Sequence, residues 1–438
     1  MGWEFAIVEL LGGGWSVPGR VPPHNAMSYE NLTRKLTSGE AVVAGVLSGT
    51  SADGIDCALC RMVSAGAPEL LAFQTLPFDE VGGPEDEIPS EPLRDRLRQL
   101  LDGAAMGPRE LALFSRDLGR AFGRAVARVS RDSDLSVDLI GSHGQTVYHH
   151  DGLEGSGAAT LQIGDGDFVA FEAGAPVVSD FRQADIAAGG EGAPLTALCD
   201  DELFAELVRP AAILNLGGIA NLTLLSERGT PPVAFDTGPA CSLLDGLSRR
   251  LLGSACDLGG ACASRGRPAP ALVAELLEHP FLLRPPPKST GRDTFGLRFV
   301  ELVIDRSRFH GLDPEGRPEA VLASAVAFIG ESIALGLERF APAIPVSLVL
   351  CGGGGRNRAL VGAIERASSA EMLSSTDFGV SPDAREAICF ALLAARFVLE
   401  IPSTREPVTG ASEGSVLGKL SWWRGETRAF DSSPPSFP

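Results

Sequence analysis

The chain has 438 residues, with 37 Lys and Arg against 56 Asp and Glu, so its formal net charge at neutral pH is −19. This balance excludes a nucleic-acid-binding protein, which needs basic side chains to neutralise phosphates, and a protein held on anionic lipid. Hydrophobic residues make up 44% and charged residues 21%, which excludes a wholly disordered chain.

At roughly 150 residues per domain, the length predicts two or three domains. Glycine accounts for 52 residues, and no repeating period explains this excess over the usual share of about 7%. The eight cysteines are scattered, and no apolar run reaches the roughly 18 uncharged residues of a membrane helix; residues 321–337 come closest and contain Glu331. The first residues carry no early positive charge typical of a secretory signal. We therefore expect a reduced, cytoplasmic protein that binds no membrane.

The first half of the chain alternates short apolar runs with polar turns. Residues 1–40 show no sustained period and predict a poorly ordered extension, with Met27 a possible true start. Residues 41–47 predict a buried strand, which the turn SGTSADG joins to an extended segment at 55–62. Apolar residues at helical spacing follow: Leu111, Phe114, Leu118, Phe122 and Val126. Short strands at 137–140 and 177–178 then run into the polar segments GSHGQTVYHH and SDFRQADIAAGGEGAP.

The second half repeats this arrangement. Strands at 211–216 and 222–225 flank the turn GGIAN. Helix spacing marks 321–337, a strand at 346–350 meets CGGGGRN and a helix at 357–366, and a last helix is expected at 384–400. The order predicts a mixed α/β protein of two related halves. We place the first domain at 41–205 and the second at 206–438, with helix 384–400 packing back on the first.

Three glycine turns follow or join strands and are suited to phosphate. In SGTSADGID, Gly49 and Gly54 expose backbone N–H groups, while Thr50 and Ser51 add hydroxyl donors. In the same motif Asp53 and Asp56 are candidate ligands of a hydrated Mg²⁺. NLGGIAN occupies the matching place in the second half, and the four glycines of CGGGGRN leave room for a flat ring. Each cluster alone is also typical of a tight turn. No Walker-type phosphate loop and no protein-kinase motif set is present.

Three further segments carry polar groups suited to a substrate. Asp180 ends an apolar strand, where a general base can be fixed, although from the residues alone a helix cap or ion-pair partner is the slightly favoured interpretation. SHGQT (142–146) suits a sugar or a carboxylate, and the spacing of His143, His149 and His150 matches no metal site. KSTGR (288–292) offers two cations and two hydroxyls to an anionic group.

Taken together, these motifs resemble the anhydro-N-acetylmuramic acid kinase family over roughly residues 42–420. The resemblance rests on seven segments: SGTSADGID, SHGQT, SDFRQADIAAGGEGAPL, NLGGIANLT, FDTGP, KSTGRDTF and CGGGGRN. It implies a two-domain ribonuclease-H-like (actin- and hexokinase-type) α/β fold with an ATP cleft between the domains. It also implies ATP- and Mg²⁺-dependent conversion of 1,6-anhydro-N-acetylmuramic acid to N-acetylmuramic acid 6-phosphate, in peptidoglycan recycling.

The resemblance assigns roles to individual residues. Asp180 in SDFR is the expected base, and Glu386 in EAICFA is the expected second carboxylate near the attacking water. The expected substrate contacts are His143, Gln145, Arg182, Lys288, Ser289, Thr290 and Arg292. The expected nucleotide contacts are Gly49, Thr50, Ser51, Ala52, Asp53, Gly54, Ile55, Asp56, Gly217, Gly218, Asn221, Gly352, Gly353, Gly354 and Asn357, with Asp53 and Asp56 at the metal.

The chain departs from the family pattern at a few positions. Ala240 and Cys241 follow FDTGP where the family has Gly-Asn, and Cys256 stands where we expect Tyr. These departures leave open a nucleotide-binding regulator that has lost turnover; a kinase for another anhydro-sugar is the other alternative. A homodimer is expected, with the small sugar as substrate and no nucleic acid or membrane partner.

Overall fold

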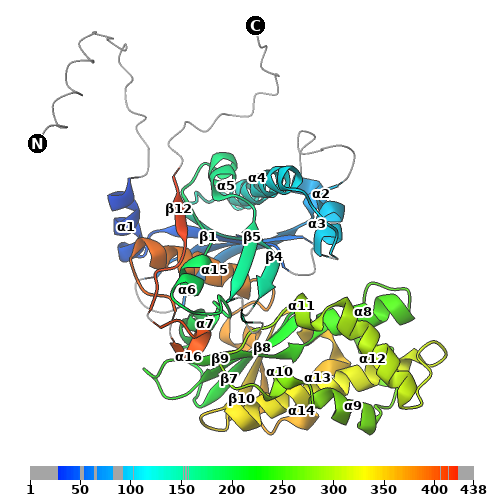
Figure 1. Ribbon diagram of the computed structural model, residues 1–438. Helices are drawn as coiled ribbons and strands as arrows, with labels where there is room; N and C mark the ends of the chain where they lie inside the picture. Colours follow the sequence, from blue (N-terminus) through cyan, green and yellow to red (C-terminus); the bar gives the residue numbers. More distant parts are fainter. Residues whose placement is uncertain are drawn as a thin grey trace, which may run out of the picture.

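The computed structural model describes residues 28–49, 54–63, 67–81, 92–101, 103–150, 152, 155, 157–404, 406–412 and 414–422. Two β-sheets are stacked with helices between them and helices on both outer faces (Figure 1). The N-terminal sheet and its helices are called the first domain below, and the other sheet and its helices the second domain.

The first sheet has the strand order β12-β6-β4-β1-β2-β3, with β5 paired to β4. Strands β1, β4 and β6 are parallel, whereas β1–β2, β2–β3 and β6–β12 are antiparallel. Its strands are β1 (Val42–Leu47), β2 (Ile55–Arg61), β3 (Glu69–Leu76), β4 (Leu139–His150), β5 (Ala159–Ile163), β6 (Val177–Ser179) and β12 (Lys419–Ser421). The helices that precede the second sheet in the chain are α1 (Tyr29–Ser38), α2 (Phe78–Val81), α3 (Leu93–Leu101), α4 (Pro108–Asp132), α5 (Gly166–Ala173), α6 (Gln183–Ala187) and α7 (Ala197–Leu203).

The second sheet has the order β11-β10-β7-β8-β9. It repeats the order and the parallel and antiparallel pairing of β6-β4-β1-β2-β3 in the first sheet. Its strands are β7 (Ala211–Leu216), β8 (Ile219–Leu225), β9 (Val233–Pro239), β10 (Ser347–Cys351) and β11 (Glu371–Ser374). Its α-helices are α8 (Cys241–Leu251), α9 (Pro270–Leu277), α10 (Pro280–Leu283), α11 (Arg292–Phe295), α12 (Leu297–Phe309), α13 (Pro318–Phe340) and α14 (Arg358–Ala367). Short 3-10 turns are η2 (Leu258–Gly260), η3 (Ala263–Arg265), η4 (Gly353–Arg356) and η5 (Ser375–Phe378). A hairpin followed by parallel strands in both halves is the ribonuclease-H-like order that the sequence predicted.

Helix α15 (Arg385–Val398) occupies the layer between the sheets, where it packs on β1, β2 and β4. Glycines in the sheet permit this close approach, because a Cβ at Gly45 would lie 1.7 Å from the carbonyl oxygen of Ala387, and one at Gly141 would lie 2.0 Å from that of Phe390. Its other side joins a core with Ile213 and Val349 of the second sheet. The chain then passes through α16 (Glu406–Thr409) to β12, at the edge of the first sheet. Residues 385–421 therefore tie the second domain to the first.

Both faces of the central strands are covered, so their sequences are continuously apolar rather than alternating. Every residue of β7 is buried, and the same holds for five of the six in β1. Helix α4 covers the outer face of the first sheet, and α13 lies in the core of the second domain. By length and composition α13 passes as a membrane span, but 72% of its most apolar window is buried inside the protein, as expected of a core helix.

Two predictions from the sequence are wrong in their bounds. The extension was expected to be poorly ordered to residue 40, yet α1 forms at 29–38, with Leu32 and Leu36 buried and the Tyr29 hydroxyl donating to Val398 O at 2.8 Å. An amphipathic helix this short has too few apolar positions to be recognised by period alone. Residues 1–27 lie outside the described part. The strand expected at 137–140 runs instead over 139–150, so SHGQT lies within β4 rather than after it.

Candidate active site

The candidate substrate residues gather where the parallel strands of the first sheet end. Strands β1, β4 and β6 point the same way, so Gly49, His143 and Asp180 lie toward the same edge. In open α/β sheets, ligands bind at the carboxyl ends of the strands. The opposing surface comes from the second domain and from the start of α15.

Arg182 and His143 form the centre of this group. Arg182 Nε donates to His143 Nε2 at 3.0 Å, and Arg182 Nη1 donates to Gly192 O at 2.6 Å. Because Nε2 accepts, the ring proton is on Nδ1, which donates to Gly144 O at 3.1 Å. Burial, together with the Arg182 charge, holds the pKa of His143 well below 6.5. His143 is therefore a neutral ring, stacked 4.5 Å from Phe390, and the described residues contain no cluster of metal-ligating side chains.

Acidic side chains from both domains surround Arg182. Burial lowers the pKa of its guanidinium, and Glu386, Asp236 and Asp185 act in the opposite direction. Asp185 is buried and accepts hydrogen bonds from Gly192 N at 2.7 Å and from Thr409 Oγ1 at 2.6 Å. These contacts fix the segment after α6, whose Gly192 O accepts from Arg182.

Asp236 on β9 is the acidic side chain of the second domain that interacts with Arg182. Its Oδ2 accepts from Thr290 N at 2.8 Å, while its own N–H donates to Lys288 O at 3.0 Å. Burial raises the pKa of this carboxyl to about 7, and the nearby Glu191 charge adds to the rise. Pairing in the second sheet places Asn215, Asn221 and Asp236 opposite one another on neighbouring strands, in a polar row across β7, β8 and β9.

Glu191 links the two domains directly. Its carboxylate accepts from Ser289 N at 2.6 Å and Ser289 Oγ at 2.7 Å, and from Arg284 Nη2 at 2.5 Å. The Ser289 hydroxyl also lies 3.3 Å from His149 Nε2 of β4. The loop after α6 and the segment KSTGR are thereby held together across the interdomain boundary.

Asp180 directly follows β6 and has the left-handed backbone angle φ +56°. A non-glycine residue in this region is strained, and such residues concentrate at functional sites. Its carboxylate is 28% exposed and forms an ion pair with Lys419 of β12. Glu386 lies in the first turn of α15, where its Oε1 accepts from Asn215 Nδ2 at 3.3 Å. Glu386 therefore lies beside the polar row of the second sheet and Asp180 at the end of β6, and their catalytic roles stay predictions.

The first phosphate hairpin is only partly visible, because Thr50, Ser51, Ala52 and Asp53 lie outside the described residues. Asp56 begins the paired part of β2 and accepts from Thr75 Oγ1 at 2.6 Å. Ile55 is buried in the core, so any contact with a nucleotide is through its backbone. A hydrated Mg²⁺ held mainly by phosphates needs only one or two carboxylates, and Asp56 fits that requirement.

The second and third glycine turns lie against each other. Gly217 O and Gly218 O accept from Cys241 N and Ala240 N, which ties the β7–β8 hairpin to the start of α8 through backbone groups. The departures at 240 and 241 therefore leave this anchoring intact. Asn221 lies on β8, in the polar row described above.

Two glycines of CGGGGRN are required by packing rather than by a ligand. A Cβ at Gly352 or Gly354 would lie 2.8 or 2.7 Å from the nearest atoms of Asn215 and Leu216, whereas one at Gly353 or Gly355 would meet nothing within 4 Å. Asn357 accepts from Leu360 N at 3.1 Å and caps α14. Beside this turn lies a surface hollow of about 610 Å³ lined by Leu258, Gly259, Ala261, Ser264, Arg356, Arg358 and Ala359.

The fold places the residues of the segment KSTGR in different surroundings. The structure does not bring the Lys288 ammonium to the other candidates: it is buried, donates to Phe281 O at 3.2 Å and Leu282 O at 3.1 Å, and lies among the rings of Phe235, Phe281 and Phe340. Ser289 and Thr290 face Glu191 and Asp236 instead. Arg292 begins α11, and its side chain is outside the described part.

Several buried polar atoms near the site make no hydrogen bond within the described residues. They are Ser48 Oγ, Ser142 Oγ, Gln145 Oε1 and Thr290 Oγ1. Buried polar groups are normally paired, so unpaired ones at strand ends are suited to a hydroxyl-rich ligand. Sequence reasoning missed Ser48, Asn215, Asp236 and Lys419. Ser48, Asn215 and Asp236 had a signal, since they belong to the motifs SGTSADGID, NLGGIAN and FDTGP, whereas Lys419 belongs to none.

Comparison with known proteins agrees with this geometry. The family model "Anhydro-N-acetylmuramic acid kinase" matches residues 41–422. Proteins of that name from Cyanothece sp., Salinibacter ruber and Bacillus cereus are 38%, 37% and 35% identical. The matches cover 86%, 86% and 87% of this chain and 98%, 96% and 99% of the relatives. The chain belongs to the anhydro-N-acetylmuramic acid kinase family.

Proposed function

We propose that the protein is an ATP-dependent kinase that opens 1,6-anhydro-N-acetylmuramic acid with water and phosphorylates O6, giving N-acetylmuramic acid 6-phosphate. The relatives named above carry the substrate in their names. The observation that supports the proposal is that Arg182, two residues beyond Asp180 at the end of β6, interacts electrostatically with Glu386 of α15 and with Asp236 of the second domain. The pathway we propose is peptidoglycan recycling in the cytoplasm.

The sugar is proposed to bind between residues 143–145 of β4, the end of β6 and the segment 289–292. Gln145 Oε1 and Thr290 Oγ1 are buried without partners in the described residues, and both suit sugar hydroxyl or amide groups. Arg182 is the cation for a carboxylate of the substrate, and neutral His143 fixes its direction. Lys288 is not part of this site in our proposal, because its ammonium points into the core of the second domain.

Asp180 is proposed to act as the general base. It takes a proton from water as the water oxygen bonds to C1, and the bond between C1 and O6 breaks. O6 then attacks the γ-phosphorus, and the bond from that phosphorus to the bridging oxygen breaks, so ADP leaves. The water supplies the new hydroxyl at C1, and its proton passes from Asp180 to solvent. Glu386, hydrogen-bonded to Asn215, is proposed to orient the same water.

The nucleotide is proposed to lie between the two hairpins, with its phosphates at Gly49, Gly54, Gly217 and Gly218. The open backbone at Gly353 and Gly355 and the hollow beside it fit an adenosine group. Mg²⁺ bound with the phosphates would neutralise developing charge, held by Asp56 together with Asp53. Domain closure would exclude bulk water from the γ-phosphate.

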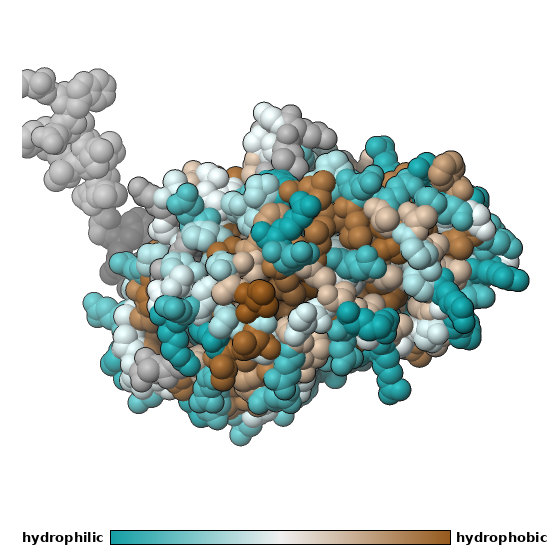
Figure 2. All heavy atoms as spheres, turned by 90° about the horizontal axis from the view of Figure 1, so that it is seen from below, coloured by the Kyte–Doolittle hydropathy of each residue, from teal (hydrophilic) through white to brown (hydrophobic). Residues whose placement is uncertain are grey.

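The expected homodimer also remains a proposal. The underside of the molecule shows apolar side chains scattered among charged ones (Figure 2). Val208 and Ile344 are 73% and 83% exposed, near the beginnings of β7 and β10. Size-exclusion chromatography with light scattering distinguishes a dimer from a monomer.

The direct test is incubation with ATP, Mg²⁺ and the anhydro-sugar, followed by mass spectrometry. We expect N-acetylmuramic acid 6-phosphate and equimolar ADP. A folded protein that binds ATP but forms no product from this sugar would contradict the proposal and favour the regulator. Product from a different anhydro-sugar alone would identify the sibling kinase.

A further inference from the structure

We propose that Lys419 is the positioning residue for the base: it holds one carboxylate oxygen of Asp180 and leaves the other for water. This inference rests on the proposed function, in which Asp180 takes a proton. Lys419 is 239 positions away in sequence and comes from the last strand of the described chain.

The ion pair with Lys419 makes the two carboxylate oxygens of Asp180 different from each other. Lys419 Nζ donates to Asp180 Oδ2, and within the described residues Oδ1 makes no hydrogen bond. A base must be fixed within hydrogen-bond reach of the proton it takes, and a free carboxylate rotates between orientations. An anchored Oδ2 restricts that rotation while Oδ1 keeps its lone pairs for water.

The backbone places both partners without help from the ligand. Strand β12 pairs with β6 in the register Lys419–Ser179, so Lys419 lies beside the residue that precedes Asp180. The approach of β12 depends on Gly418, which has φ +122° and whose added Cβ would lie 2.4 Å from Val178 Cγ1. Asp180 in turn has φ +56°, which directs its side chain differently from a continuing strand. Two unusual backbone positions thus meet at one ion pair.

The chemistry of the pair favours positioning over stability. The Lys419 side chain is 69% exposed, and exposed ion pairs contribute little to folding. The same charge becomes more effective when substrate and domain closure displace water from the site. Its loss is therefore expected to change turnover much more than melting temperature.

The test compares Lys419→Ala, Lys419→Gln and Lys419→Arg with the wild type. A matched control is Lys35→Ala, because Lys35 also forms an ion pair with a single aspartate, Asp138, at 2.7 Å. We measure kcat and KM for both substrates, binding of the anhydro-sugar by calorimetry, and melting temperature. For Lys419→Ala and Lys419→Gln we expect kcat to fall by about 10-fold or more, with KM and sugar affinity nearly unchanged. Lys419→Arg should restore much of kcat, and Lys35→Ala should keep it.

The outcomes separate this inference from the function on which it rests. Wild-type protein without product refutes the proposed function, and an active Asp180→Asn variant refutes the base. If Asp180→Asn is inactive while Lys419→Ala and Lys419→Gln keep wild-type kcat, the positioning role is overturned. A raised KM for the sugar with unchanged kcat also overturns it, because Lys419 would then be a substrate contact.

Discussion

Arg182 Nε donates to His143 Nε2 across 3.0 Å, and this hydrogen bond joins a cation to a buried neutral ring at the centre of the site. The imidazole stays neutral because burial and, after it, the Arg182 charge hold its pKa well below 6.5. The guanidinium interacts electrostatically with Asp236 of the second domain. His143 lies within β4 and Arg182 follows β6, 39 positions later in the chain, so the bond also depends on the register between these two parallel strands.

The first prediction concerns the pH dependence of stability at His143. The pKa of folded His143 is depressed by burial, so the unfolded state alone takes up its proton as the pH falls below about 6.5. Stability from this group is therefore lost toward acid pH, by at most about 1.4 kcal/mol per pH unit. His143→Gln should lose less melting temperature than the wild type between about pH 7.5 and about pH 5.5. Parallel losses in both proteins would contradict a neutral His143.

Asp236 should show the opposite sign. Its folded pKa is raised from 3.8 to about 7, so the folded state retains a proton that the unfolded state releases. The stabilisation is complete below the unfolded pKa and is lost as the pH rises toward about 7. Asp236→Asn keeps an acceptor for Thr290 N and removes the titration. Relative to wild type, it should gain melting temperature between about pH 5 and about pH 8, measured without ligands. If the melting temperatures of Asp236→Asn and the wild type differ by the same amount at both pH values, the raised pKa of Asp236 is wrong.

Glu191 should matter for domain closure rather than for folding. Glu191→Ala removes the acceptor for Ser289 and Arg284, so the two domains should separate more in solution. We expect a larger radius of gyration by X-ray scattering and a fall of about 10-fold in kcat/KM for the sugar. The control is Glu69→Ala, which removes the exposed ion-pair partner on β3 of Arg61 on β2. It should change neither the radius of gyration nor kcat/KM. Equal scattering curves for wild type and Glu191→Ala would contradict the role.

The ion pair of Arg385 and Asp200 is expected to govern stability. Both side chains are buried, 1% and 0% exposed, and Thr223 Oγ1 donates to Asp200 Oδ2 at 2.8 Å. Arg385→Met leaves a buried carboxylate without its cation, which costs about 3–5 kcal/mol of unfolding free energy. Urea unfolding measures this loss.

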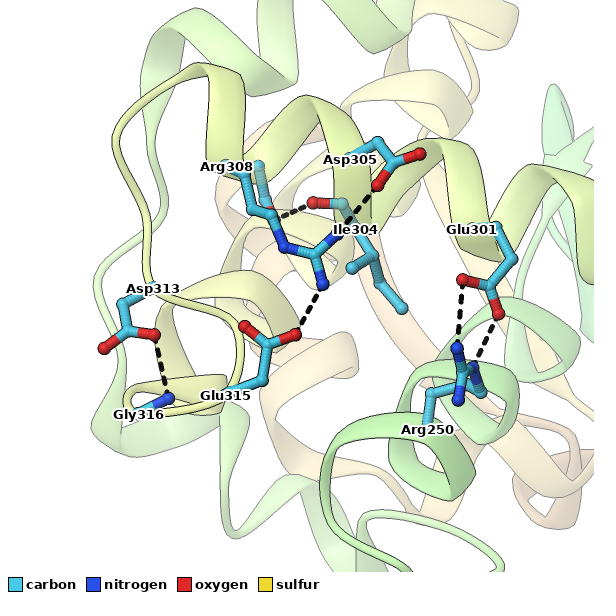
Figure 3. Close-up of polar contacts among 9 residues, drawn as sticks. Arg250, Glu301, Ile304, Asp305, Arg308, Asp313, Glu315 and Gly316 are labelled. Atoms are coloured by element: carbon cyan, nitrogen blue, oxygen red, sulfur yellow. Dashed lines mark hydrogen bonds and ion pairs between the residues drawn. The ribbon is translucent and has the colours of Figure 1, made fainter.

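The matched control for that substitution is an exposed pair on the surface of the second domain. Arg250 of α8 and Glu301 of α12 are 57% and 48% exposed and form two hydrogen bonds (Figure 3). Arg250→Met should leave the urea midpoint almost unchanged. Equal losses in the two variants would show that burial does not determine the contribution of Arg385.

Much of the framework was predictable because local patterns and strand ends carry it. The apolar runs at 42–47 and 211–216 predict the two hairpins, and parallel strand ends bring His143, Asp180 and Arg182 toward one edge. Glu386 was reached by resemblance alone, since an acid in the first turn of a helix is ordinary.

The remainder depends on contacts that no local pattern contains. KSTGR resembled a set of substrate contacts, but the fold places the Lys288 ammonium among three aromatic rings in the core. The pairing of Asn215, Asn221 and Asp236 requires the register of two hairpins. Lys419 meets Asp180 only because β12 returns to the first sheet.

The central claim is that water opens the anhydro bridge while O6 receives the phosphoryl group. Running the reaction in ¹⁸O water and fragmenting the product by mass spectrometry tests it most directly. Unlabelled N-acetylmuramic acid 6-phosphate kept in the same water for the same time corrects for exchange at C1. We expect ¹⁸O at C1 beyond that exchange, an unlabelled phosphate, and no product with Asp180→Asn. ¹⁸O in the phosphate group of the product, or no product from wild-type protein that binds ATP, would contradict it.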